Sequence, residues 1–383
     1  MKNKVKYQHL QLSIALPWMM FFLACTSLKA ATIKLPDDGV YMPQKPNKLI
    51  QATQEVKQTD NHSKVNYAEA LMPSVQPEVT RAVEPAPMEM SNMPHPNLDL
   101  VPPPVAGFDE LRIRDSAEPL AESREDKGAF RVSCDYSHMN NDDAIVYPNQ
   151  QGKAHLHVYF GNTNVNYLST AESIRTTGNS TCNGGIMNRT AYWAPAMIDT
   201  ESGTPLKPRN ALFYYKHGKV QEIPRGLKMI AGNMESTSAQ SHEWFECNEK
   251  YASRRPYLVS CNKGGLVTVS VTFPNCWNGK DLDSADHKSH MAYSTNGRCP
   301  GSHSKKLPTL SILIYYPVTS DKGTANWRLS SDNYAKDKRA GYSSHSDFIM
   351  GWDEEIHKAW VDNCINAAKD CHAHLIGDGR EFY

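Results

Sequence analysis

The chain has 383 residues, with 41 Lys and Arg against 41 Asp and Glu, so its formal net charge is zero. Balanced charge without a Lys/Arg block in the second half excludes the electrostatic footprint of a nucleic-acid-binding protein. The length permits two or three domains, but the composition changes so much along the chain that the segments must be considered separately.

The first 30 residues have the pattern of an export signal. Lys2, Lys4 and Lys6 precede an apolar run from Leu10 to Cys25, and a small-residue cleavage site ends at residue 30. The run is too short and too broken by Pro17 for a transmembrane helix. We therefore expect an exported protein, located in the periplasm, at the cell surface or outside the cell. An uncleaved membrane anchor and lipidation of Cys25 remain alternatives.

Residues 31–128 form the second segment, which is rich in Pro, Gln, Asn, Ser and Glu and includes VPPPV at Val101 to Val105. No hydrophobic period is sustained there, so the segment cannot bury a core. We predict a disordered, proline-rich tether, with a small folded unit as the alternative. From Phe130 onward apolar residues, cysteines and histidines begin together, which predicts one domain over residues 129–375 and a tail over 376–383.

The predicted domain contains short β-strands. In AHLHVYFG, residues 154–161, His155, His157 and Tyr159 alternate with apolar residues, as expected of a strand with two imidazoles on one face. Four later segments are short, rich in β-branched and aromatic residues and bounded by Gly, Pro or Asn: ALFYYK, GLKMIAG, GLVTVSVTF and LSILIYY. Together they predict a mainly β fold, a β-sandwich or jelly roll.

One helix is predicted after Asp353, which is suited to cap its N-terminus. Its apolar stripe would consist of Ile356, Trp360, Cys364, Ala367 and Cys371. In a regular helix Cys364 and Cys371 lie two turns apart, too far to bond each other, so we expect each to pair elsewhere.

Cysteine usage agrees with export. Nine cysteines are present, and eight of them follow the export signal: Cys134, Cys182, Cys247, Cys261, Cys276, Cys299, Cys364 and Cys371. No spacing matches a CxxC zinc site, so up to four disulfides are expected in an oxidising compartment. Eight cysteines allow about 105 connectivities, and the sequence leaves the pairing open.

The HxH pair is the first candidate site. Alternate residues of a strand are about 6.6 Å apart, which lets His155 and His157 reach one cation at roughly 2.1 Å. A third ligand would come from His345, with His287, His290 and Asp347 as further candidates. The alternative is that these histidines are polar surface residues or are hydrogen-bonded in the core.

The second candidate site is the segment from Phe273 to Tyr293, which is the densest in ionisable groups. We predict catalytic roles, as acid, base or oxyanion stabiliser, for His287, His290, Asp286, Lys280, His345 and Asp347, with Lys288 an alternative to Lys280. Sugar rings would stack on Trp277, Trp193 and Tyr293. The alternatives are a solvated loop fixed by Cys276 and tryptophans that belong to the core.

This segment, FPNCWNGKDLDSADHKSHMAY, closely resembles the signature FPxCWDGKxLDSxDHKSHVAYP of the secreted fungal and bacterial family called domain of unknown function nineteen ninety-six. The resemblance covers most of residues 133 to 364 and includes HLHVYFGN, TAYWAP, GLKMIAG, CPGSHSKKLPTLS and SSHSDFIMGW. It places the family's recurring histidines at His155, His157, His287, His290, His303 and His345. Asn278, Asn162 and Ser304-Lys305 depart from the pattern, and Asn278 argues against a negative charge at that position.

The resemblance implies no particular reaction, but fungal members are often joined to sugar-binding WSC modules. We therefore expect an exported domain that acts on extracellular polysaccharide or cell-wall glycan as a hydrolase or lyase, with one divalent metal ion as its cofactor if the histidines bind metal. The alternative is a non-catalytic glycan- or cell-wall-binding module. No GxSxG elbow, P-loop or GxGxxG motif points to another chemistry.

Overall fold

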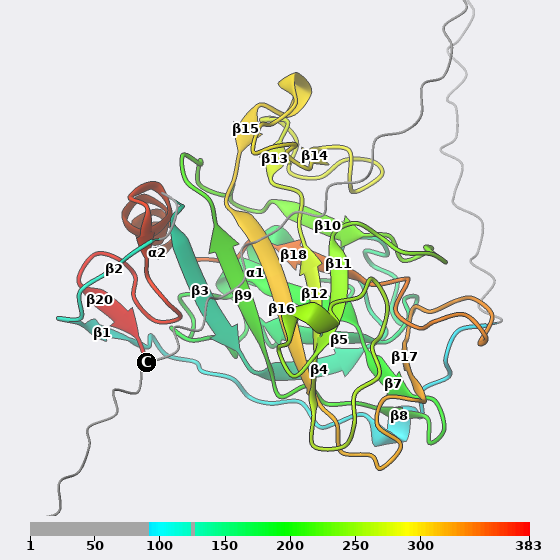
Figure 1. Ribbon diagram of the computed structural model, residues 1–383. Helices are drawn as coiled ribbons and strands as arrows, with labels where there is room; N and C mark the ends of the chain where they lie inside the picture. Colours follow the sequence, from blue (N-terminus) through cyan, green and yellow to red (C-terminus); the bar gives the residue numbers. More distant parts are fainter. Residues whose placement is uncertain (1–91, 124–126) are drawn as a thin grey trace, which may run out of the picture. The chain divides into compact units, whose positions relative to one another are not determined.

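The computed structural model describes residues 92–123 and 127–383 and confirms the mainly β fold. Two large sheets pack face to face, and one short helix follows the last of their long strands (Figure 1). The predicted export signal, Cys25 and residues 31–91 of the predicted tether lie outside the described residues.

The larger sheet has seven strands in the order β11-β12-β16-β9-β3-β19-β2. Neighbours are antiparallel except β19 and β3, which are parallel. The strands are β2 (Ala121–Glu122), β3 (Ala129–Cys134), β9 (Asn210–Lys216), β11 (Glu243–Cys247), β12 (Leu266–Thr272), β16 (Thr309–Pro317) and β19 (Lys369–Asp370).

The second of the two large sheets has five strands, all antiparallel, in the order β10-β18-β6-β5-β4. In Figure 1 this sheet lies in the layer behind the larger sheet. The five are β4 (Tyr136–Asn140), β5 (His157–Gly161), β6 (Ala191–Pro195), β10 (Lys228–Gly232) and β18 (His345–Ile349).

Short elements complete the fold. Three minor sheets are formed by β1 (Ile113–Asp115) with β20 (Arg380–Phe382), by β13 (Cys276–Trp277) with β14 (Met291–Ala292) and β15 (Lys305–Lys306), and by β7 (Met197–Asp199) with β8 (Thr204–Pro205) and β17 (Trp327–Leu329). The helical segments are α1 (Ala171–Thr176), α2 (Glu354–Trp360), its π-helical continuation η5 (Val361–Asn366), and the 3₁₀ turns η1 (Leu98–Leu100), η3 (Tyr251–Ser253) and η4 (Gly301–His303).

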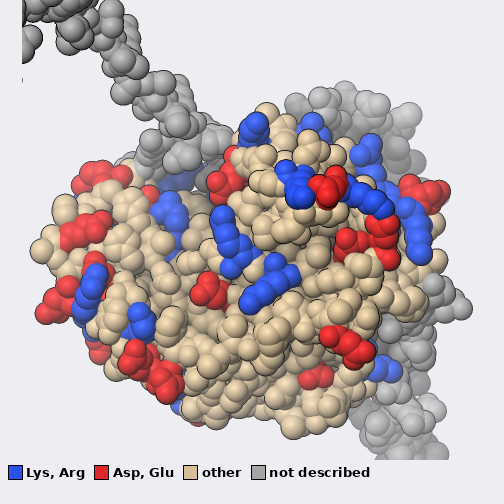
Figure 2. All heavy atoms as spheres, turned by 90° about the horizontal axis from the view of Figure 1, so that it is seen from below, with Lys and Arg blue, Asp and Glu red and all other residues tan. Residues whose placement is uncertain are grey.

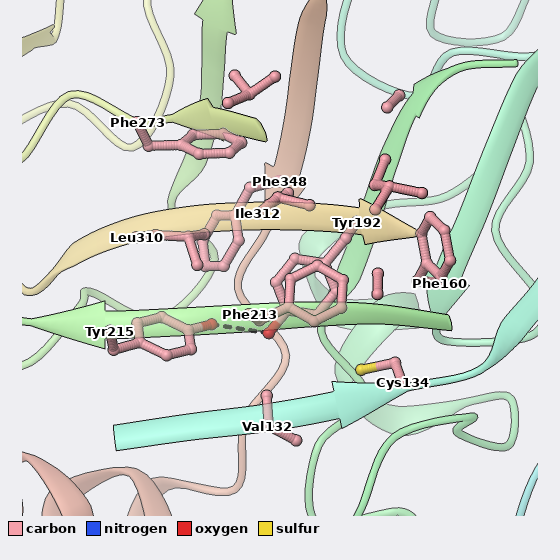
Figure 3. Packing of buried hydrophobic residues seen from close by; sticks show 14 of the residues in the cluster. Val132, Cys134, Phe160, Tyr192, Phe213, Tyr215, Phe273, Leu310, Ile312 and Phe348 are labelled. Carbon is pink, nitrogen blue, oxygen red and sulfur yellow. Dashed lines mark hydrogen bonds between the residues drawn. The ribbon is translucent and has the colours of Figure 1, made fainter. Parts of the chain in front are cut away.

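The main core fills the space between the two large sheets. Strands β12 and β16 turn every second residue into this core, for example Val269 and Ile314, as the period of two of a β-strand requires. Across the interface the rings of Tyr192 and Phe213 have centroids 3.8 Å apart, and the hydroxyls of Tyr192 and Tyr215 are hydrogen-bonded at 2.7 Å (Figure 3). Aromatic burial of this kind dominates the stability of a sandwich core.

A second, smaller core covers the opposite face of the five-stranded sheet. It consists of Ala144, Ile145, Tyr159, Val165, Ile174, Ala191, Trp193 and Ile349, contributed by three strands, by the loops after β4 and β5, and by α1. The five-stranded sheet is therefore buried on both faces. This double burial explains why all five residues of β5, β6 and β18 are buried, whereas β9 shows strict alternation.

Four disulfides are present, the number that the even cysteine count predicted. The bonded pairs are Cys134–Cys182, Cys247–Cys261, Cys276–Cys299 and Cys364–Cys371. This content agrees with an oxidising compartment. Among the residues that the structure describes, none belongs to a helix that meets the length and hydropathy needed to cross a membrane.

The prediction that Cys364 and Cys371 pair with other cysteines is wrong. The helix does start after Asp353, whose side chain accepts from the backbone N–H groups of Glu355 and Ile356. It ends at Asn366, and Ala368 then takes a left-handed φ of 55°, so the chain reverses. The reversal brings the two Cα atoms to 5.8 Å, and it also leaves Ala367 exposed rather than on the buried stripe.

The predicted domain boundaries are also wrong at both ends. Within residues 92–123, β1 pairs with β20 and β2 pairs with β19, and the backbone N–H of Val105 donates to the carbonyl of Ser137. Strand β20 itself belongs to the segment that we expected to be a tail. Strand β2 extends the edge of the seven-stranded sheet, and β1 with β20 forms a two-stranded sheet of its own; such backbone pairing needs little hydrophobic periodicity.

Charged side chains are interspersed on the surface. On the face shown in Figure 2, acidic and basic residues alternate, and no broad patch of one sign forms. This distribution agrees with the balanced composition and offers no extended basic surface on that face for a nucleic-acid backbone.

A buried histidine makes the stability of the fold depend on pH. His357 in α2 is 2% exposed, and its Nε2 accepts a hydrogen bond from the backbone N–H of Ile223 at 3.3 Å. Burial lowers the pKa of His357 to about 3. The unfolded chain, with a pKa near 6.5, therefore binds more protons between these values, and stability is lost as pH falls through this window.

We predict that His357→Gln flattens this dependence. As pH falls from about 6 to about 4, the wild type should lose up to about 1.4 kcal/mol of unfolding free energy per pH unit more than the variant. Urea denaturation at several pH values measures the difference, and His374→Gln, a partly exposed position, is the matched control. Parallel curves for wild type and His357→Gln would contradict the prediction.

Candidate functional site

The five-stranded sheet carries a compact cluster of ionisable side chains at the margin of the second core. The histidine–aspartate cluster consists of Asp143, His155, His157, His345 and Asp347. There are two overlapping sets, His155 with His157 and His345, and Asp143 with His157 and Asp347. In each set, every residue offers one potential ligand atom, and these atoms lie within 4.8 Å of one another. All five residues are buried.

Strand register explains how distant residues meet. On β5, His157 and Tyr159 point to the second core, while Val158 and Phe160 point to the main core. Tyr159 lies opposite Trp193 of β6, and Trp193 lies opposite Asp347 of β18. Because alternate residues share a face, His345 lies on the same side as Asp347 and next to the imidazole of His157. The predicted alternation is therefore confirmed for residues 157–160, whereas His155 lies two residues before β5.

The three imidazole rings are close enough to share an ion. Their centroids are 4.2 Å apart for His155 and His157, 5.0 Å for His155 and His345, and 6.0 Å for His157 and His345. Rings that bind one ion through nitrogens at about 2.1 Å have centroids roughly 4.5 to 6.5 Å apart. The observed separations are close to this range.

Backbone carbonyls fix the orientation of two of these rings. Nδ1–H of His157 donates to the carbonyl of Asp142 at 2.9 Å, and Nδ1–H of His345 donates to the carbonyl of Ser343 at 2.8 Å. In each neutral ring this leaves Nε2 unprotonated, with its lone pair free. Metal-binding histidines are held by their second nitrogen in this way.

A buried hydrogen-bond network holds the loop that leads into β18. The side chain of Asp332 is fully buried and accepts hydrogen bonds from the Tyr334 hydroxyl at 2.8 Å, the Ser343 hydroxyl at 2.6 Å and the Gly341 amide at 2.9 Å. Ser343 in turn accepts from His345. Asp332 thus positions a cluster histidine without touching the cluster itself.

The carboxylate oxygens of the two cluster aspartates accept fewer hydrogen bonds than those of Asp332. Backbone amides of Ile145 and Val146 donate to Oδ1 of Asp143, each at 2.8 Å. Both oxygens of Asp347 are buried without a hydrogen-bond partner, as are both nitrogens of His155 and Nε2 of His157. Unpaired buried polar atoms are rare and costly, and so many in one place indicate a missing partner.

Burial shifts the pKa values of the whole cluster. It lowers the pKa of His157 to about 4 and of His345 to about 3, and that of His155 well below its usual value. Burial raises the pKa of Asp143, and it raises that of Asp347 well above its usual value, with the charge of Asp143 adding to the effect. The imidazoles are thus neutral donors, while the carboxylates need a cation to be ionised.

The donor set fits a divalent transition metal. Imidazole nitrogens suit Zn²⁺, Cu²⁺, Fe²⁺ and Ni²⁺, and the carboxylates would balance the charge of the ion. His155 and His345, which are 6% and 4% exposed, are the most accessible of the three imidazoles.

Sequence reasoning identified four of the five cluster residues and missed Asp143. His155, His157, His345 and Asp347 were predicted from their HxH and HxD spacing. Asp143 ends a run of four polar residues, 140–143, directly after β4, and that run is the only signal that pointed to it. Its place in the cluster depends on the loop that folds back over the sheet.

The segment from Phe273 to Tyr293, here called the signature segment, supplies no histidine to the cluster. Nε2–H of His290 donates to the carbonyl of Lys228 at 2.7 Å, and its Nδ1 lies 2.9 Å from the Ser284 hydroxyl, so both nitrogens have partners. Nδ1 of His287 pairs with Asp283 at 2.9 Å. Of the candidates for a third ligand, His287 and His290 therefore do not belong to the groups of ligand atoms that form the cluster, whereas His345 does.

The other predicted residues of this segment have local roles. Oδ1 of Asp286 accepts from the amides of Lys288 and Ser289, which stabilises the turn. Backbone and hydroxyl donors lower the pKa of this carboxyl. Lys280 is 84% exposed and lies 3.9 Å from Asp281. Neither side chain belongs to the cluster.

The predicted sugar-stacking residues do not form one platform. Trp193 is fully buried in the second core with its ring stacked on Tyr159, so it offers no face to a sugar. Tyr293 stacks on His242 with centroids 3.7 Å apart and donates to the carbonyl of Thr272. Trp277 is partly exposed, and its indole N–H donates to the carbonyl of Asp281.

Two further features lie apart from the cluster. The partly exposed residues Glu118, His374 and Glu381 also have ligand atoms within 4.8 Å of one another, but Arg114 already pairs with Glu381 at 2.6 Å. A shallow groove of about 630 Å³ lies along β4 and has only uncharged residues, such as Asn140, in its wall.

The family of the chain follows from a comparison with known families. Residues 143–352, more than half of the chain, match the model described as Domain of unknown function (DUF1996), and the chain belongs to this family. The matched range begins at Asp143 and contains all five residues of the cluster. No curated protein and no solved structure matches the chain.

We predict that His290 is needed for stability and not for the cluster. His290→Ala removes the partners of the Lys228 carbonyl and the Ser284 hydroxyl, which should cost about 1–3 kcal/mol of unfolding free energy. Chemical denaturation measures the loss, with His303→Ala, a more exposed histidine of the same family pattern, as control. An unchanged unfolding free energy for His290→Ala would contradict this role.

Proposed function

We propose that this protein is exported and uses the histidine–aspartate cluster to bind one divalent transition-metal ion. The observation that carries the proposal is the set of buried, unpartnered ligand atoms on His155, His157 and Asp347. A dication would give each of these atoms a partner and would compensate the charge of the two carboxylates. Four disulfides and the predicted export signal support the exported location.

We further propose that the bound ion serves a hydrolase or lyase acting on extracellular polysaccharide or cell-wall glycan. The substrate class is supported by the resemblance to a family whose members often carry sugar-binding modules. The ion would act as a Lewis acid or lower the pKa of a bound water. The chain's own residues would hold the ion in place and exclude bulk water, since all five ligands are buried.

A second candidate function is a non-catalytic glycan- or cell-wall-binding module in which the ion is structural. The observation in its favour is the near-complete burial of the cluster, since structural metal sites are closed and catalytic ones keep an open position. In that case the glycan would bind elsewhere on the domain.

We predict that the purified full-length protein contains one transition-metal ion per chain and that His157→Ala weakens metal binding by at least about 100-fold. Removing a ligand should exceed the 10- to 100-fold effect of losing an outer-shell partner. Elemental analysis and a competition titration with a chromophoric chelator measure both quantities, with His303→Ala as control. Wild-type protein without metal that also fails to take up added ions would refute the metal site.

Activity separates the two functions. We expect the metal-loaded wild type to cleave at least one member of a polysaccharide panel, detected as new reducing ends for a hydrolase or unsaturated products for a lyase. Chelation and His157→Ala should abolish turnover while circular dichroism shows the fold retained. Absence of turnover on every glycan, combined with glycan binding that survives His157→Ala, would favour the binding module.

A further inference from the structure

The signature segment borders the cluster through a lysine rather than a histidine. Its loop runs along β10, the edge strand of the five-stranded sheet. His290 bonds the carbonyl of Lys228 at the start of β10, and the ammonium of Lys288 donates to the carbonyl of Gly232 at its end, at 2.9 Å. The loop is thus bound to both ends of β10. Lys288, which contacts the C-terminal end of the strand, is exposed.

Gly232 places Lys288 beside a cluster residue. Gly232 lies directly opposite His345 in the pairing of β10 with β18. The two backbones are so close that a Cβ added to Gly232 would lie 2.9 Å from the Cα of His345 and 2.5 Å from the carbonyl oxygen of Ser344. The ammonium of Lys288 is therefore hydrogen-bonded to the residue that pairs with His345, a candidate metal ligand. Its positive charge acts on both His345 and Asp347.

In the proposed metal-bound cluster, a dication would balance the carboxylates of Asp143 and Asp347, so the cluster itself would not neutralise the positive charge of Lys288. The buried acid on which Lys288 also acts is Glu243, whose pKa is raised by burial to about 7. Asp283 is already paired with Lys228 at 3.1 Å.

We infer that Lys288 is an anion-binding residue at the rim of the histidine–aspartate cluster, and that the group approaching the metal ion is a carboxylate. This inference rests on the proposed metal site and specifies its substrate class: an acidic polysaccharide that carries uronate groups. A lysine ammonium binds a carboxylate through a charge-assisted hydrogen bond. The same interaction would also bind a small free carboxylate such as acetate. The experiment below distinguishes a small free carboxylate from a uronate group of a polysaccharide.

The test is a ligand titration of full-length protein loaded with Co²⁺, whose visible spectrum reports changes at the ion. Acetate, oligogalacturonate and a neutral oligosaccharide are titrated against the wild type, Lys288→Met, Lys288→Arg and Lys280→Met. Lys280→Met is the matched control, since Lys280 belongs to the same segment but is 84% exposed and outside the cluster. Metal content is measured for every variant.

We expect Lys288→Met to keep its Co²⁺ and to bind oligogalacturonate roughly tenfold or more weakly, since a hydrogen bond to a charged group is lost. Lys288→Arg should stay within a few-fold of the wild type, and Lys280→Met should be unchanged. The neutral oligosaccharide should not alter the spectrum in any variant.

Three results would overturn the inference while leaving the proposed metal site in place. Lys288→Met that binds carboxylates as the wild type does would show that the lysine only fixes β10. Equal weakening for neutral and acidic ligands would show a positional effect rather than a charge effect. Oligogalacturonate that binds no better than acetate would exclude the acidic polysaccharide. Failure of the wild type to bind Co²⁺ would instead overturn the proposed metal site and, with it, this inference.

Discussion

Two carboxylates are buried next to each other in this structure. The unfavourable free energy of their burial is the main constraint on the arrangement of the site. Asp143 and Asp347 lie in the interior beside three imidazoles, and no protein group donates to either oxygen of Asp347. An isolated buried carboxylate is so unfavourable that it either takes up a proton or requires a cation. The imidazoles beside it are neutral and held in orientation, so their unprotonated nitrogens can bind a metal ion. A protonated aspartate would not account for the unpaired nitrogens of His155 and His157.

The double burial of the five-stranded sheet makes this arrangement possible. A sandwich sheet ordinarily exposes one face to water, where histidines and aspartates would be solvated and far from neutral partners. Here the loops after β4 and β5, together with α1, form a second core over that outer face. The covering loop brings Asp143 onto the sheet, and the same loop excludes the water that would otherwise hydrate the cluster.

The signature segment has a different role from the one its composition indicates. Its density of ionisable groups is used mostly within the segment: Asp286 caps a turn, Asp283 pairs with His287, and His290 bonds the backbone of β10. Such local hydrogen bonds require specific residue types at fixed spacing as strictly as catalysis does. A dense motif therefore indicates a conformation as readily as an active centre.

The sequence by itself determined the strands, because the alternation in β5, β9, β12 and β16 is a local property of the chain. It also indicated that His157 and Tyr159 share one face of β5, that α2 starts after Asp353, and that up to four disulfides form. Spacing alone could not determine how segments far apart in sequence meet. The tertiary structure decided that His345 and Asp347 join the HxH pair while His287 and His290 do not, because strand order and register set these distances. It likewise decided that Cys364 bonds Cys371, because the chain reverses at Ala368 once the helix has packed.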